Sequence, residues 1–211
     1  MPRKTPRRHQ QGDESRQRIL ATTLEIAAER GYDGTTVALV TERTGLPASS
    51  VYWHFKNKDE LLAETLEYSY RQWRESTPTW AAAEAPDDLG AEIRDRLHTA
   101  ARAISLSPEF WRLGLMLALE RRTKEPAARR RYVEVRDDTA RTIELWWRSV
   151  LPAVLLARHD DLAHQLARMQ LAMMDGFFIG VRSSPDWDLE VLVNMLAQGI
   201  HAHIATLEKA A

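Results

Sequence analysis

The sequence predicts an all-α protein, and three observations support this. Its 211 residues include 28 Ala and 25 Leu, which form helices readily, against only 10 Val and 8 Ile, which favour strands. Gly and Pro, which interrupt helices, number only nine each. Apolar and polar residues do not alternate over any sustained stretch, and no Asn-Gly or Asp-Gly pair joins two alternating runs. We therefore expect helices packed around a core large enough for one or two domains.

Overall charge and cysteine content exclude several classes of protein. The 29 Lys and Arg nearly balance 30 Asp and Glu, which argues against a histone-like protein, and 44% hydrophobic residues argue against a disordered acidic chain. The absence of Cys excludes disulfide scaffolds, thiolate zinc sites and cysteine nucleophiles. The apolar runs are too short to span a bilayer and no secretory signal is present, so we expect a cytoplasmic protein without membrane contact.

Charge is unevenly distributed along the chain. Residues 1–60 carry a net charge of +2, and the remainder carries −3. The first twelve residues contain two Pro, no acidic residue and four basic ones, which are Arg3, Lys4, Arg7 and Arg8. We expect residues 1–14 to form a disordered basic arm, with a solvated tail of no function as the alternative.

The first two helices carry clear start and stop signals. Ile19, Thr23 and Ile26 recur at the spacing of a helix face, and Gly31 is a typical residue at the end of a helix. Thr36 is a good N-cap for a second, short helix.

A third and a fourth helix follow closely. Gly45 suits a left-handed turn after the second helix, and a third helix is expected over residues 48–54. Asn57 with Glu60 three residues later resembles a capping box that opens the fourth. In all we expect nine helices, roughly over residues 15–30, 37–44, 48–54, 57–76, 88–106, 108–124, 126–151, 160–182 and 185–207.

The second and third helices, joined by the turn at Gly45, form a helix-turn-helix pattern. The third helix must bury one side, and Val51 and Phe55 can do this. Its other side then presents small and polar groups together with Tyr52 and Trp53. Such a pattern is typical of a helix that enters the major groove of DNA.

The segment from Ile19 to Leu62 resembles the TetR family of bacterial transcriptional regulators. The residues that carry the resemblance are Gly31 to Val37, Gly45-Leu46 and the run from Val51 to Leu62. This last run, Val-Tyr-Trp-His-Phe-Lys-Asn-Lys-Asp-Glu-Leu-Leu, is the most specific part. The resemblance implies three parts: the basic arm (1–14), a helix-turn-helix DNA-binding domain (15–60), and a ligand-sensing and dimerisation domain (61–211).

The resemblance also implies which residues meet DNA. The third helix would lie in the major groove, Thr36 would cap the second helix and reach a phosphate, and Lys58 would contact the backbone. The positions that touch bases or phosphates are those of Ala48, Ser49, Ser50, Tyr52, Trp53 and His54.

This sequence departs from the family pattern on the second and third helices. Ala38, Leu39 and Ala48 stand where many members carry basic or polar residues. We therefore expect Arg3, Lys4, Arg7 and Arg8 to supply more of the affinity for DNA, in the minor groove.

The last two long helices resemble the pair through which members of the family dimerise. A short recognition helix covers few bases, so two half-sites in a palindromic operator and a homodimer are expected. The alternative is that both apolar stripes face the core of one protomer. The expected interface residues are Leu162, Leu166, Met169, Leu192, Leu196 and Ile200.

Large, adaptable side chains gather on the middle helices and suit an apolar pocket, although a plain core gives the same pattern. That a pocket for a small-molecule effector lies here is what the resemblance implies. The candidate lining residues are Trp111, Leu115, Met116, Trp146, Trp147, Met173 and Phe177.

No motif for catalysis, a metal or a cofactor stands out. His159 and His164 are five residues apart and diverge around a helix, and His201 and His203 cannot share a face either. The sequence lacks a phosphate-binding glycine loop and a nucleophile elbow.

The preferred interpretation is a homodimeric repressor released from its operator by a small molecule. The first alternative is a DNA-binding regulator that needs no ligand or that activates transcription. The second is a small-molecule-binding or hydrolytic helical protein with a vestigial DNA-binding domain.

Overall fold

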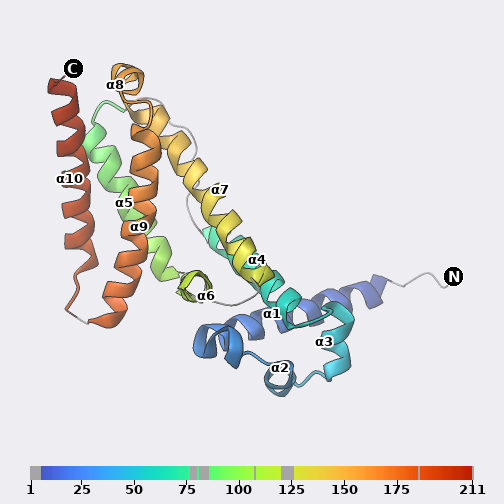
Figure 1. The fold of residues 1–211 in the computed structure, drawn as a ribbon. Helices are drawn as coiled ribbons and strands as arrows, with labels where there is room; N and C mark the ends of the chain where they lie inside the picture. The colour runs from blue at the N-terminus through green and yellow to red at the C-terminus, as the bar shows by residue number, and fades with distance from the viewer. Residues whose placement is uncertain are drawn as a thin grey trace. The chain divides into compact units, whose positions relative to one another are not determined.

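The computed structural model describes residues 6–76, 80, 86–106, 108–119, 126–184 and 186–210. These residues form ten α-helices and no strand (Figure 1), which confirms the all-α prediction. The helices are α1 (Pro6–Gly34), α2 (Val37–Thr44), α3 (Ala48–His54), α4 (Lys58–Ser76), α5 (Leu89–Leu106), α6 (Pro108–Leu119), α7 (Ala127–Val150), α8 (Ala153–Arg158), α9 (Leu162–Ser183) and α10 (Leu189–Lys209).

Helix α1 begins earlier than the sequence suggested. It starts at Pro6, so residues 6–14, which were expected in a disordered arm, are helical. Proline is favoured in the first turn of a helix, and no other proline follows before Ser15, so the helix can extend through this polar segment.

Two further boundaries differ from expectation. Helix α8 was not predicted, because six residues are too few to show helical periodicity. Helix α10 begins at Leu189 because the Asp188 carboxylate accepts hydrogen bonds from the backbone N–H groups of Glu190 and Val191 at 3.0 and 3.1 Å. The sequence placed the start of this helix at residue 185, four residues earlier.

The chain divides into two compact units. Unit 1 comprises Met1–Gln72 and Pro108–Glu134, and unit 2 comprises Trp73–Ser107 and Val135–Ala211. The sequence placed everything after residue 60 in a second domain, whereas the first part of α4, all of α6 and the start of α7 belong to unit 1.

The core of unit 1 joins α1, α2, α3 and the start of α4. Partly buried Val37, Leu39 and Leu46 pack against it from α2 and the turn. Because the same core holds both short helices, their relative position is fixed by packing. The buried core residues are Ile19, Leu20, Ile26, Val40, Val51, Phe55 and Leu61.

Two glycines allow α6 to approach its neighbours closely in unit 1, Gly31 at the contact with α1 and Gly114 at the contact with Tyr132 of α7. Gly31 has φ 73° and interrupts the helical geometry of α1, and a Cβ built there would lie 2.9 Å from the end of the Met116 side chain. A Cβ at Gly114 would lie 2.2 Å from the ring of Tyr132. The Arg112 guanidinium also donates to the carbonyl of Ala28 at 3.4 Å. None of these contacts follows a local sequence pattern.

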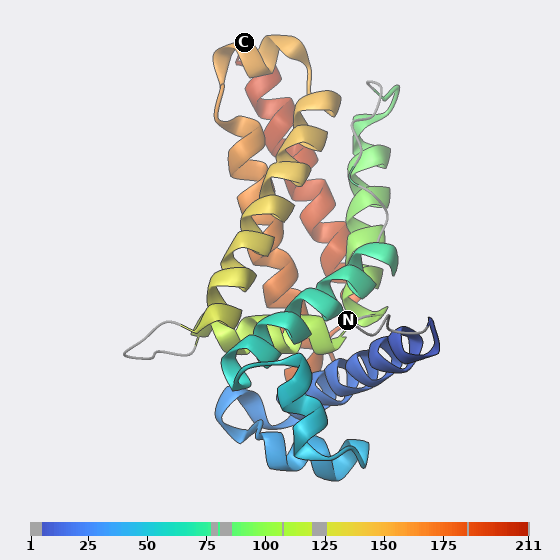
Figure 2. The same ribbon diagram turned by 90° about the vertical axis from the view of Figure 1, so that its right-hand side faces the viewer.

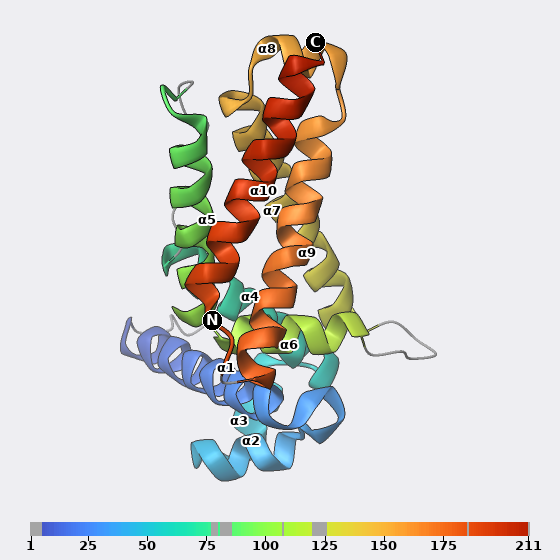
Figure 3. The same ribbon diagram turned by 90° about the vertical axis from the view of Figure 1, so that its left-hand side faces the viewer.

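Unit 2 contains α5, α8, α9, α10 and the larger part of α7. Helix α10 lies alongside α5, and α9 packs against α5 as well (Figure 3). Helix α8 lies near the carboxyl-terminal end of α10 (Figures 1 and 2). The fully buried Trp146 and Trp147 are the largest core side chains, and the Trp147 indole donates to the Gln170 amide oxygen at 3.2 Å.

Candidate nucleic-acid interface

The turn between α2 and α3 has the geometry that its residues predicted. The Thr36 hydroxyl accepts a hydrogen bond from the backbone N–H of Leu39 at 3.2 Å, which confirms Thr36 as the N-cap of α2. Gly45 has φ 68° and ends α2 in the left-handed conformation. Thr36 is itself exposed, so its cap function leaves it on the surface of unit 1.

Helix α3 presents one buried and one exposed side. Val51 and the following Phe55 lie in the core of unit 1. The exposed side carries Tyr52 and Trp53, whose surfaces are 57% and 67% accessible. Of the remaining candidate DNA-contacting residues on α3, Ala48 and Ser49 are exposed, while Ser50 and His54 are half-buried.

His54 has a specific partner within the protein. Its Nε2 lies 2.8 Å from the Ser15 hydroxyl of α1. Burial, together with the positive charge of Arg16, holds the pKa of His54 below its ordinary value, against the opposing effect of Asp13. The His54 ring therefore takes up a proton less readily than an ordinary histidine.

Lys58 is also engaged within unit 1. Its ammonium group donates to the carbonyl of Asp33 at 3.3 Å and lies 4.6 Å from the centre of the Tyr32 ring. The start of α4 is capped by Asn57, whose side-chain oxygen accepts from the backbone N–H of Glu60 at 2.9 Å, as predicted. The Glu60 carboxylate in turn accepts from the backbone N–H of Lys56 rather than from that of Asn57.

Only part of the predicted basic arm belongs to the residues that the structure describes. Arg3 and Lys4 lie outside the described residues. The backbone of Arg7 and Arg8 belongs to the first turns of α1, and their side chains lie outside the described part. Their expected contact with DNA stays a prediction.

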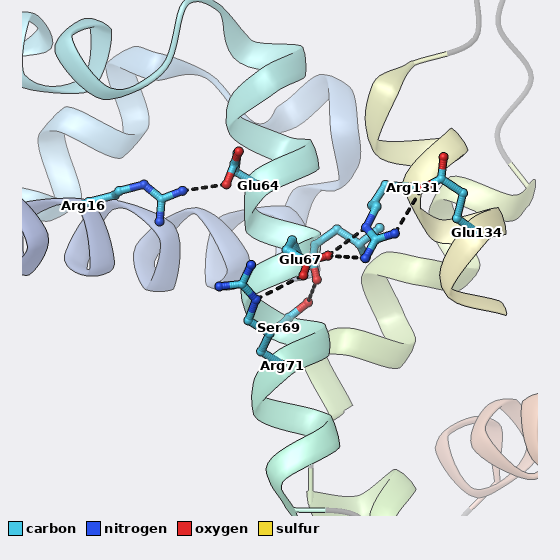
Figure 4. A network of polar contacts seen from close by, with 8 residues as sticks. Arg16, Glu64, Glu67, Ser69, Arg71, Arg131 and Glu134 are labelled. Atoms are coloured by element: carbon cyan, nitrogen blue, oxygen red, sulfur yellow. Dashed lines mark hydrogen bonds and ion pairs between the residues drawn. The ribbon is translucent and has the colours of Figure 1, made fainter. Parts of the chain in front are cut away.

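A charged network connects α4 with the start of α7 in unit 1 (Figure 4). The Glu67 carboxylate accepts hydrogen bonds from Arg131 at 2.7 Å and from Arg71 at 3.0 Å. Burial raises the pKa of Glu67, but these guanidinium groups outweigh it, so the pKa lies below its ordinary value. Arg131 also pairs with Glu134 at 3.0 Å.

The candidate pocket residues fall into both units. In unit 1, Trp111 is buried, and Leu115 and Met116 are partly buried. In unit 2, Trp146, Trp147 and Phe177 are buried, whereas Met173 is exposed. Trp80, which the sequence did not single out, meets Trp146 edge to face with ring centres 5.3 Å apart, and the Arg96 guanidinium lies over both rings.

The candidate dimer residues line an apolar groove of about 440 Å³ between α9 and α10, except for Leu192. The sequence missed four further residues that line this groove, which are Gln165, Met195, Gly199 and His203. Met195 is 63% exposed.

Two other findings concern metals and membranes. No group of three or more His, Asp or Glu that could hold a metal ion occurs among the described residues. Within the same residues, no helix is both long and apolar enough to cross a bilayer.

Known proteins resemble this chain in the helix-turn-helix region and in overall fold. Residues 19–65 match the family model of bacterial regulatory proteins, tetR family. The HTH-type transcriptional regulator AcrR of Shigella flexneri is 35% identical over 69 residues, which are 33% of this chain and 31% of AcrR. The HTH-type transcriptional regulator CymR of Pseudomonas putida is 28% identical over 160 residues, covering 74% of this chain and 76% of CymR.

A solved structure resembles this chain in fold beyond the matched residues 19–65. A tetR-family transcriptional regulator from Streptomyces coelicolor has a TM-score of 0.67 at 12% identity, covering 94% of this chain and 84% of that one. The sequence match includes the capped α2, the left-handed turn at Gly45 and the two-sided α3. Residues 19–65 therefore carry the helix-turn-helix region of the tetR family of bacterial regulatory proteins, and the chain as a whole shares the fold of a solved tetR-family regulator.

Proposed function

We propose that the protein is a sequence-specific DNA-binding transcriptional regulator whose recognition element is α3. The observation that carries this proposal is the exposed side of α3, where Tyr52 and Trp53 stand out beside Ala48 and Ser49 while Val51 is fixed in the core. A helix of this kind fits the major groove, which is about 12 Å wide.

The side chains on α3 suggest how DNA is read. The hydroxyls of Ser49 and Ser50, in its first turn, suit phosphate contacts, which position a protein without reading sequence. Tyr52 and Trp53 suit apolar contact with thymine methyl groups and with base edges. Thr36 adds a hydroxyl at the start of α2, and Lys58 supplies a positive charge near the start of α4.

The functional form is a homodimer built on α9 and α10. Exposed Met169, Met173 and Met195 form an apolar surface on these helices, and the groove between them is lined mainly by apolar side chains. Figure 3 views unit 2 from the side on which α9 and α10 are uncovered by other elements. A second copy of the chain would bury this surface. Two copies of a seven-residue α3 would then read a palindromic operator of two half-sites.

An effector molecule binds in unit 2 and releases the repressor from its operator. The buried indole N–H of Trp146 has no hydrogen-bond partner among the described residues, and a buried donor left unpaired costs about 1–3 kcal/mol. A ligand with a hydrogen-bond acceptor next to Trp146 and Trp80 would satisfy it. Effector and operator binding oppose each other through a coupling free energy of about 1–3 kcal/mol.

Selection of bound sequences from a pool of random DNA duplexes tests this function. The wild-type protein is expected to enrich an inverted repeat with half-sites about one helical turn apart. The variant Trp53→Ala is expected to enrich a weaker or altered motif. Recovery of no motif by the wild-type protein would contradict the proposal.

A further inference from the structure

The segment of α1 from Gly12 to Arg16 contacts the carboxyl-terminal end of α3 in unit 1. Ser15 lies 2.8 Å from the ring of His54, the last residue of α3. A Cβ built at Gly12 would lie 3.7 Å from the indole of Trp53, which is an ordinary contact distance. Next to Ser15, Arg16 pairs with Glu64 of α4 at 2.5 Å (Figure 4). The segment from Gly12 to Arg16 therefore connects α1 with both neighbouring helices.

The hydrogen bonds around Ser15 define the state of the His54 ring. The Ser15 hydroxyl lies 2.9 Å from the carbonyl of Gly12, and this carbonyl can only accept. Since a hydroxyl has one proton, Ser15 donates to Gly12 and accepts from His54. The Nε2 atom of His54 therefore carries a proton. This bond forms with the neutral ring and with the charged ring alike.

The orientation of α3 depends on such anchors because the helix is short. Seven residues make about two turns, and helices of this length are unstable by themselves. Val51 and Phe55 hold the middle and the end of α3 from the core side. The bond from His54 to Ser15 holds its last turn from another direction. The exposed Trp53 ring lies edge to face with His54, at 4.5 Å between ring centres and 82° between planes.

We propose that Ser15 is a positioning residue that, through His54, sets the pose in which Trp53 meets DNA. This inference rests on the proposed DNA-binding function. Ser15 itself need not touch DNA. The resemblance to known regulators placed His54 among the DNA contacts, whereas the geometry gives it an intramolecular role.

The experiment measures affinity for the selected duplex and for a shuffled duplex with four proteins: wild type, Ser15→Ala, Ser15→Thr and Ser183→Ala. Ser183 is a matched control, because its hydroxyl donates to the carbonyl of Ile179 in α9 and lies in unit 2. Thermal unfolding of each variant monitors the fold.

Ser15→Ala is expected to bind the selected duplex about five-fold more weakly, the order of one hydrogen bond. Its affinity for the shuffled duplex stays unchanged, because non-specific binding depends on phosphate charge. Ser15→Thr keeps the hydroxyl and restores the affinity, and Ser183→Ala binds like the wild type. Equal affinity of Ser15→Ala and the wild type for the selected duplex would overturn the inference. Equal weakening on both duplexes would also overturn it.

A double-mutant cycle separates the positioning role from a direct contact. If Ser15 acts through His54, then Ser15→Ala has no further effect in a His54→Ala background. Additive losses would mean that the two residues act independently, and would overturn the inference. If the wild-type protein selects no motif from random DNA, the proposed function itself is contradicted. If it selects a motif that Ser15→Ala binds as tightly as the wild type, only the inference about Ser15 is contradicted.

Discussion

The carboxylate of Asp59, in the first turn of α4, accepts hydrogen bonds at 2.9 and 3.1 Å from the backbone N–H of Ala127, the first residue of α7. A helix begins with N–H groups that lack partners inside the helix, and a side chain 68 residues away in sequence satisfies one of them here. Asp59 lies within the segment that resembles known DNA-binding domains. One residue of that segment therefore also determines where α7 starts.

Asp59→Ala is expected to lower the free energy of unfolding by about 1 kcal/mol, the usual cost of losing a helix cap. Asp161→Ala is the matched control, because Asp161 precedes α9 and its side chain caps no backbone N–H. Urea unfolding followed by circular dichroism, at equal protein concentrations, measures both. A control variant destabilised as much as Asp59→Ala would contradict this account.

The Glu67 network predicts a pH dependence of stability. The pKa of Glu67 lies below the ordinary value of 4.5, so its ionised form stabilises the fold above that pH. This contribution is lost as the pH falls through the lowered pKa. Glu67→Gln is therefore expected to cost about 1 kcal/mol at neutral pH and to approach the wild type in acid.

Glu134→Gln serves as the control for that measurement, because Glu134 also pairs with Arg131 but is more exposed. It should change the unfolding free energy little at any pH. A Glu67→Gln variant that differs from the wild type by the same amount at neutral and acid pH would contradict the assignment.

The sequence was sufficient for those parts of the molecule that depend on local chemistry. Thr36, Gly45 and Asn57 have the cap and turn geometries expected of them, because a cap or a left-handed turn depends on residues a few positions apart. The buried side of α3 followed from the spacing of Val51 and Phe55 for the same reason.

The missed features depend on contacts between distant residues. His54 contacts Ser15, which lies 39 residues earlier in the sequence. Lys58 contacts Asp33 and Tyr32, which lie 25 and 26 residues earlier. No periodicity in the sequence indicates these pairs. The inclusion of α6 in unit 1 rests on Gly31 and Gly114, whose missing side chains make room for others. A glycine inside a helical pattern shows that something approaches closely, but not what approaches.

Gly114→Ala is expected to destabilise the protein by about 1–3 kcal/mol, the usual cost of overpacking a core. The new methyl group would lie 2.2 Å from the Tyr132 ring, which must then move. Gly12→Ala is the control, because the nearest atoms there are at an ordinary 3.7 Å. Thermal unfolding compares the two, and equal melting temperatures for Gly114→Ala and the wild type would show that the ring is not packed as described.

The environment of His54 can be tested by NMR titration of the ring. Its pKa is expected below 6.5 in the wild type, and Arg16→Gln should raise it, because a nearby positive charge is removed. Arg18→Gln, a change at an exposed neighbouring position, should leave the pKa of His54 unchanged. A pKa that does not respond to Arg16→Gln would contradict the geometry around Ser15.

If the proposed dimer forms through α9 and α10, Met195→Glu is expected to yield a monomer, because a carboxylate in the groove between these helices would lie in an apolar interface. Gln198→Glu introduces the same charge at an exposed neighbouring position of α10 outside the groove lining. Analytical ultracentrifugation gives the mass of each. A dimeric Met195→Glu variant would place the interface elsewhere.

The ratio of affinities for the selected inverted repeat and for a shuffled duplex, at one salt concentration, tests the central claim most directly. Sequence-specific recognition by α3 predicts a ratio of at least about 10³ for the wild type, and a large reduction in Trp53→Ala. A ratio near one would mean that the protein binds DNA only through charge, and would contradict its assignment as a sequence-specific regulator.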